Sequence, residues 1–317
     1  MSKRDRRIDP RELKRLSVLE PRKSLTAIAS DWAIIAAAIA ASEYAGHPIV
    51  YVIAVTLIAG RMHALGCLVH EAAHYRIIRD RKVSDWMGDV LLAWPILGTV
   101  DGYRQNHLAH HQHANTDHDP DWTSKVGMAQ FTFPQKLARG ITQLLGYLVA
   151  INSIRDLMHM ARRIGKSDRS TRGYKALRLG FYLGATVVFT ILGIWREFVI
   201  YWLVPYFTFF CLFLYVRSVA EHFGSMDYSD ELTSSRTVYP HAWEKLFFAP
   251  HNINYHLEHH LYPGVPYYNL PELHAILMRN EAYAAKAHIT RGYTTGLPAE
   301  CFASNAPLLP SQHPASY

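Results

Sequence analysis

Cysteine is scarce in this chain of 317 residues. Its three cysteines, Cys67, Cys211 and Cys301, include no CxxC pair. An odd number of isolated cysteines indicates neither a disulfide framework nor a metal site made of thiolates. Cys67 and Cys211 lie in apolar runs, where we expect them to be small packed side chains. A metal site in this protein must therefore draw on nitrogen and oxygen ligands.

The chain also lacks the features of a cleaved signal peptide. Residues 1–24 carry nine lysines or arginines and four acidic residues, and no small-residue cleavage site follows the next apolar run. Such a basic segment could bind nucleic acid, but the apolar run directly after it favours a cytoplasmic membrane flank. We therefore expect a basic cytoplasmic N-terminal arm over 1–24 and no nucleic-acid partner.

Apolar and polar residues are strongly segregated along the chain. Hydrophobic residues make up 50% of it, and they gather in long runs that alternate with basic, histidine-rich stretches. This pattern is typical of a polytopic membrane protein with a soluble cap. Basic segments at 76–82 and 155–178 lie on the same side as the N-terminus, so the runs form two out-and-back hairpins. We expect four membrane spans, near residues 25–44, 49–69, 179–195 and 198–216.

The predicted fold is therefore all-α, with two transmembrane hairpins and a cytoplasmic helical cap that carries the histidine-rich stretches. Residues 85–99 are too short and too interrupted to span a membrane, and their tryptophans suit an interfacial or re-entrant helix. We expect the apolar stretch 137–154 to lie along the membrane interface. The tail at 291–317 has no apolar period, and we expect it to be poorly ordered.

Eleven of the 19 histidines fall in three short windows, 70–74, 107–118 and 251–260. Within them, histidines are spaced by three or four residues, which places them on one face of a helix. Neutral imidazole is a common ligand for zinc, iron, copper and nickel. The three windows therefore predict one metal centre that is assembled from three helices.

The first window alone, His70-Glu71-Ala72-Ala73-His74, also matches the HExxH pattern of zinc hydrolases, with Glu71 as general base. A catalytic zinc takes three protein ligands, which leaves the two later clusters unexplained. A zinc-dependent membrane hydrolase is therefore an alternative that accounts for the first window alone.

Histidine ligands without thiolates suit a pair of iron ions with open positions for O₂. Such a pair at the membrane surface could reduce O₂ to an oxidant that takes hydrogen from an unactivated C–H bond, and an apolar pocket would protect it. Nearby carboxylates could accept the second ring N–H of the ligand histidines and so fix their tautomers. The candidates are Glu71, Asp117, Asp119, Asp121, Glu221 and Glu258.

These clusters resemble the three histidine boxes, HxxxH, HxxHH and HxxHH, of the membrane fatty acid desaturase superfamily. The resemblance covers about residues 25–290, and the run from Tyr255 to His274 is similar to the third box of bacterial members. It implies a desaturase domain over 25–290, two iron ions as cofactor and O₂ as co-substrate. The implied ligands are His70, His74, His107, His110, His111, His256, His259 and His260.

The resemblance also adds a ninth ligand, since family members use a histidine just after the last span and His222 occupies the matching position. His113, His118 and His251 match no ligand, and we expect them behind the ligands or at the surface. His63 shares the helical stripe of His70 but lies about 10 Å before it along the axis. A packing or substrate-channel role is expected for His63.

The resemblance leaves the reaction open, because desaturases, hydroxylases and ketolases share this scaffold. The third box favours desaturation of a fatty acyl chain. The stretch from His110 to Trp122 also resembles carotenoid ketolases, and some bacterial relatives act on small amino-acid derivatives. A hydroxylase or ketolase acting on a carotenoid or a small amino-acid-like molecule is therefore the first alternative.

The resemblance further implies an apolar or lipid substrate, contact with membrane lipids, and a separate electron donor. No fused cytochrome b5 domain is expected, because its HPGG haem signature is absent. Electrons would come from a ferredoxin or a free cytochrome that docks on the basic cytoplasmic segments. We expect a multi-pass protein of the bacterial inner membrane with its active site on the cytoplasmic side.

Overall fold

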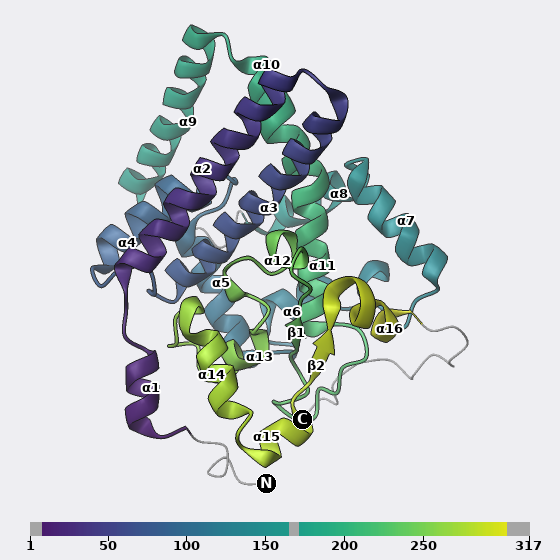
Figure 1. Ribbon diagram of the computed structural model, residues 1–317. Helices are drawn as coiled ribbons and strands as arrows, with labels where there is room; N and C mark the ends of the chain where they lie inside the picture. Colours follow the sequence, from purple (N-terminus) through teal and green to yellow (C-terminus); the bar gives the residue numbers. More distant parts are fainter. Residues whose placement is uncertain (1–7, 165–170, 303–317) are drawn as a thin grey trace.

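The computed structural model describes residues 8–164 and 171–302, and in these the chain is mostly helical (Figure 1). Four helical stretches are long and apolar enough to cross a membrane, as predicted. They are α2 (Pro21–Ala45), α3 (Pro48–Ala73), α9 (Arg172–Leu192) and the stretch Trp195–His222. The last stretch comprises α10 (Trp195–Phe198), η4 (Val199–Leu203), η5 (Tyr206–Phe210) and α11 (Cys211–His222).

The turn between α2 and α3 follows from its sequence. Gly46 ends α2 with a φ of 56°, in the left-handed region that glycine adopts without strain. The ring of His47 then accepts the backbone N–H of Ile49, and Pro48 opens α3 at a position where proline loses no helical hydrogen bond. The two helices therefore form the first predicted hairpin.

The four spans differ greatly in burial. Most of the apolar window of α3 is buried, and Ile58, Met62 and Leu65 lie in the largest hydrophobic core of the described chain. By contrast, α9 has no buried residue and stands apart from the other spans in Figure 1. It also begins at Arg172, so residues 172–178 are helical and do not belong to a basic loop. We infer that α3 is the packed centre and that α9 faces lipid.

The cap lies at one end of the spans, opposite α10 in Figure 1. The first half of the sequence contributes α1 (Pro10–Leu16), α4 (Arg81–Gly88), η2 (Asp89–Ala93), α5 (Val100–His113), α6 (Pro120–Lys125) and η3 (Ala129–Phe131). The next two helices, α7 (Leu137–Leu148) and α8 (Ile151–Ile164), lie beside the fourth span, in contact with η5. The second half contributes α12 (Glu244–Phe247), η6 (Pro250–Asn252), α13 (His256–Leu261), η7 (Tyr267–Asn269), α14 (Leu270–Leu277), α15 (Glu281–Lys286), η8 (Gly292–Gly296) and α16 (Leu297–Cys301).

The N-terminal arm is partly built into this cap. Leu16 is buried in a cluster with Leu270 and Leu273, and Arg15 pairs with Glu272 at 2.6 Å. Residues 8–20 are therefore anchored on α14. The remaining residues of the predicted arm before them, 1–7, lie outside the described part.

Two predicted interfacial segments have more internal structure than expected. In 85–99, α4 continues into the π-helix η2, and Trp94 is buried against Tyr174 and Phe181 of α9. Trp94 is thus a packing residue. The run 137–154 is divided between α7 and α8, because Ala150 adopts a φ of 63°. These two helices and the turn between them expose apolar side chains, namely Leu137, Ile141, Leu145, Val149, Ile151, Ile154 and Met158.

The prediction that the C-terminal tail is poorly ordered is wrong for residues 291–302. The strand β2 (Ile289–Arg291) pairs in parallel with β1 (Thr237–Tyr239), which adds a small sheet to the otherwise helical fold. After it, η8 and α16 bury Tyr293, Leu297 and Cys301 in a core cluster with Trp122 and Phe223. A π-helix and a short helix produce no regular apolar period, so the sequence pattern hid this packing. Residues 303–317 lie outside the described part.

Candidate metal centre

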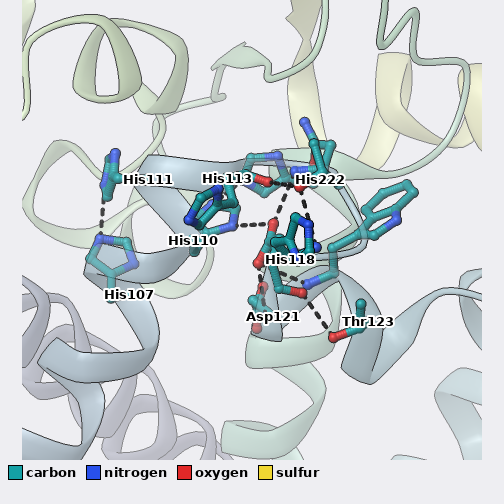
Figure 2. Close-up of polar contacts among 12 residues, drawn as sticks. His107, His110, His111, His113, His118, Asp121, Thr123 and His222 are labelled. Atoms are coloured by element: carbon teal, nitrogen blue, oxygen red, sulfur yellow. Dashed lines mark hydrogen bonds and ion pairs between the residues drawn. The ribbon is translucent and has the colours of Figure 1, made fainter. Parts of the chain in front are cut away.

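The nine candidate histidines come from four helices that meet where the spans enter the cap. His70 lies near the end of α3, and His74 is the residue that caps it. His222 is the last residue of α11. The other six are His107, His110 and His111 on α5 and His256, His259 and His260 on α13. Figure 2 shows His107, His110 and His111 on one helix, with His222 approaching from another.

Five of these histidines form what we call the five-histidine group: His70, His74, His107, His111 and His259. Their ligand nitrogens all lie within 4.8 Å of one another. The Nε2 atom of His111 is 3.0 Å from that of His107 and 2.9 Å from that of His259. The Nε2 atoms of His70 and His74 are buried and have no hydrogen-bond partner among the described residues.

The other four form the four-histidine group: His110, His222, His256 and His260. Their Nε2 atoms make a closed ring, with distances of 3.1 Å between His110 and His222 and 2.8 Å between His222 and His256. The remaining two distances are 3.0 Å between His256 and His260 and 3.2 Å between His260 and His110.

Hydrogen bonds on the far side of two rings determine their tautomers. The Nδ1 of His110 is 2.7 Å from a carboxylate oxygen of Asp119, and the Nδ1 of His222 is 3.4 Å from the carbonyl oxygen of Ser234. Both oxygens can only accept, so both Nδ1 atoms carry a proton, and in the neutral form of each ring the Nε2 atom presents a lone pair. Two facing lone pairs 3.1 Å apart repel each other unless a cation lies between them. The residues therefore fit a metal ion.

The candidate carboxylates divide into two sets. Glu71 and Glu221 lie 3.2 Å and 3.4 Å from the Nδ1 atoms of His70 and His256, and Asp119 contacts His110 as described. These three can hold ligand rings in place. The other three have different surroundings. Glu258 contacts His274 and Tyr283, Asp121 pairs with Lys125, and Asp117 is exposed.

Six histidines of the two groups that lie in the cap have lowered pKa values. Burial, followed by the charges of Arg76 and Arg104, lowers the pKa of His74 to about 4. Burial, with the neighbouring His74 and His110, lowers the pKa of His111 to about 3. Burial likewise lowers the pKa values of His107, His256, His259 and His260. Neutral imidazole is the form that binds a metal, and a lowered pKa favours this form in these six rings at neutral pH.

The zinc-hydrolase alternative does not fit this arrangement. Glu71 is buried, one carboxylate oxygen lies 3.2 Å from the Nδ1 of His70, and the other accepts the backbone N–H of Tyr267 at 3.0 Å. Neither oxygen is free to activate a water molecule. In addition, His70 and His74 converge with three further histidines, where a catalytic zinc would need one more ligand.

Four histidines outside the two groups have other contacts. The Nδ1 of His63 donates a hydrogen bond to the carbonyl oxygen of Phe247 at 2.7 Å. The rings of His113 and His118 lie 5.8 Å apart. His251 contacts Asp31 at 2.7 Å.

Two features of the surroundings were missed by sequence reasoning. Asp31 on α2 pairs with His251 of η6 at 2.7 Å and with Arg61 of α3 at 3.0 Å. Charged residues inside apolar runs are unusual, so they offered a signal. The carbonyl group of Ser234 offered none, because a backbone acceptor leaves no trace in residue type.

Comparisons with known proteins agree with this geometry. A protein-family model described as "Fatty acid desaturase" matches residues 46–293. Dihydrorhizobitoxine desaturase of Bradyrhizobium elkanii is 28% identical over 293 residues, which cover 86% of this chain and 81% of that protein. The sn-1 oleoyl-lipid 12-desaturase of Arthrospira platensis is 27% identical over 241 residues, which cover 70% of this chain and 66% of that protein.

Proposed function

Because this chain belongs to the fatty acid desaturase family, as its histidine boxes predicted, we propose that it is an O₂-dependent diiron desaturase. It introduces a double bond into a fatty acyl chain. The observation that carries this proposal is the division of nine histidines into two adjoining groups, each able to hold one ion. Neighbouring residues His110 and His111 belong to different groups, which supports two ions side by side.

In this proposal, His70, His74, His107, His111 and His259 hold one iron ion, and His110, His222, His256 and His260 hold the other. The bound pair supplies the O₂ and electron chemistry that removal of hydrogen from an unactivated C–H bond requires. The protein orients the ligand rings and excludes bulk water from the site. Asp119, Glu71 and Glu221 hold ligand rings, and burial of the rings keeps bulk water away.

A fatty acyl substrate is supported by the position of the centre. His70 and His222 lie in the last turns of two apolar, membrane-length helices, where a lipid chain in the bilayer can reach the metal groups. The sn-1 oleoyl-lipid 12-desaturase also acts on an oleoyl lipid. The dihydrorhizobitoxine desaturase, however, matches more of the chain. That match favours the alternative in which a related hydroxylase, ketolase or desaturase takes a small amino-acid-like molecule.

The surroundings of the enzyme follow from the same proposal. The cap faces the cytoplasm of a bacterial cell, the spans cross its inner membrane, and a separate ferredoxin or cytochrome supplies electrons. The exposed basic residues Arg79, Arg81 and Lys82 lie on the cap side of α3, beyond His74, and suit an acidic donor.

The test is expression of the chain in a bacterial host whose membrane lipids and metal content are then measured. We expect about two iron ions per chain, by the two-group arrangement, and new unsaturated acyl chains that are missing with the His110→Ala variant. Parallel cultures that produce a carotenoid or receive dihydrorhizobitoxine distinguish the alternatives. Oxygenated carotenoid or a desaturated small molecule, with unchanged acyl chains, would overturn the acyl-chain proposal, and one zinc without iron would overturn the diiron centre.

A further inference from the structure

Arg236 occupies an unusual position, because its guanidinium is fully buried directly beneath the end of α11. One of its terminal nitrogens donates to the carbonyl oxygens of Val219 and Ala220, at 3.2 Å and 2.9 Å. These carbonyls belong to the last turn of the helix, and that of Val219 also accepts the backbone N–H of Phe223 at 3.0 Å. The next residues along the chain are Glu221 and His222. Arg236 therefore binds α11 two residues before a candidate metal ligand.

Glu300 on α16 holds this arginine in place. Its carboxylate accepts a hydrogen bond from the other terminal nitrogen of Arg236 at 2.7 Å. The same carboxylate contacts the ring of His288 at 2.8 Å and the hydroxyl group of Thr290. Burial alone would raise the pKa of Glu300, but these partners outweigh burial and lower the pKa to about 2. The carboxylate is therefore ionised at neutral pH and balances the buried guanidinium.

The same segment also contacts His222 from the other side. Ser234, two residues before Arg236, directs its carbonyl oxygen at the Nδ1 of His222 and also accepts the amide of Asn115 at 2.8 Å. The Nε2 of His222 in turn lies between those of His110 and His256. The helix end and the ring of His222 are thus both fixed by residues 234–236. Figure 1 shows α16 beside this end of α11.

We propose that Glu300 is a positioning residue for the four-histidine group: it keeps Arg236 against the last turn of α11 and thereby keeps His222 directed at its ion. The inference rests on the proposed metal centre, and it assigns a role to the C-terminal segment 297–302. No residue of the five-histidine group contacts Arg236 or Glu300 in the described hydrogen bonds and ion pairs. The effect of losing Glu300 should therefore fall on one of the two ions.

The experiment compares Glu300→Ala with Glu244→Ala in the full-length protein. Glu244 is a matched control, since its carboxylate also anchors the C-terminal segment, through the backbone N–H groups of Tyr293 and Thr294. In the described part of the chain, the hydrogen bonds of the Glu244 carboxylate go to neither Arg236 nor α11. Iron per chain is measured on monodisperse protein, and release of iron to a chelator is followed over time.

We expect Glu300→Ala to release one of its two irons about 10-fold to 100-fold faster than the wild type, the usual effect of losing a supporting residue. The other iron should leave at the wild-type rate, and Glu244→Ala should keep both. Glu300→Gln retains an acceptor oxygen and should fall in between; it also decides the matter if Glu300→Ala does not fold.

Equal release from Glu300→Ala and Glu244→Ala would overturn the proposal, because general loosening of the segment would then explain the loss. Wild-type release from Glu300→Gln, when Glu300→Ala does not fold, would overturn it as well. These outcomes differ from failure of the proposed function, in which the wild-type protein itself would hold no iron pair.

Discussion

The five-histidine and four-histidine groups are built by different means, although they share α5 and α13. The five-histidine group takes His70 and His74 from the end of α3, the most buried span, so apolar packing holds that part in position. The four-histidine group takes His222 from α11, and polar contacts from Asp119, Ser234 and Arg236 hold it. The five-histidine group thus depends more on packing and the four-histidine group more on hydrogen bonds, so different kinds of substitution should damage each group.

The largest effect should come from removing one ligand of each group. We expect His259→Ala and His222→Ala both to abolish turnover while the protein still inserts in the membrane, because the proposed reaction needs both ions. Iron analysis should show the loss of one ion in each case. Wild-type turnover in His222→Ala would remove that residue from the ligand set and leave the four-histidine group with three members.

A hydrogen-bonding change should damage the four-histidine group alone. Asp119→Ala removes the acceptor for the Nδ1 of His110, and we expect a loss of about 10-fold to 100-fold in affinity at that group. Asp119 also caps α6, which contributes about 1 kcal/mol. The control is Asp80→Ala, which removes the cap of α4 without a histidine contact. Chelator titrations of both variants should separate the two effects, and equal affinities would contradict the role of Asp119.

A packing change should damage the five-histidine group instead. A Cβ atom at Gly60 of α3 would lie 2.9 Å from the carbonyl oxygen of Leu246 and 3.0 Å from the ring of Phe247. Gly60→Ala should therefore shift α3 and destabilise the protein by about 1–3 kcal/mol. Gly184 on α9 has open space around it, so Gly184→Ala should not lower the unfolding temperature. Equal unfolding temperatures for both variants would show that α3 is not closely packed.

The smallest effect should come from a histidine that belongs to neither group. The ring of His113 lies 5.8 Å from that of His118 and is only partly buried. We expect His113→Ala to retain both irons and to lose at most part of its activity. Loss of an ion in this variant, measured by iron analysis, would show that the two groups do not contain the full ligand set.

Several of these features could be predicted from residue order because they are local. Spacing by three or four residues placed the histidines on helix faces, and the Gly46-His47-Pro48 turn was visible as a break between two apolar runs. Asn115 and Pro263, residue types typical of turns and helix ends, follow closely after α5 and α13 in the sequence. The order of residues 291–302 was not predictable in this way, because it depends on contacts with distant segments.

By itself, the sequence determined how many apolar helices can cross a membrane and which histidines share a helix face, since length and period act within one segment. Only the tertiary structure decided that His110 and His111, adjacent in the chain, belong to different groups. It likewise brought Glu300 to Arg236, and Arg236 to the end of α11. The physical reason is that such contacts form between segments far apart in the chain, where packing of the whole fold sets the distance.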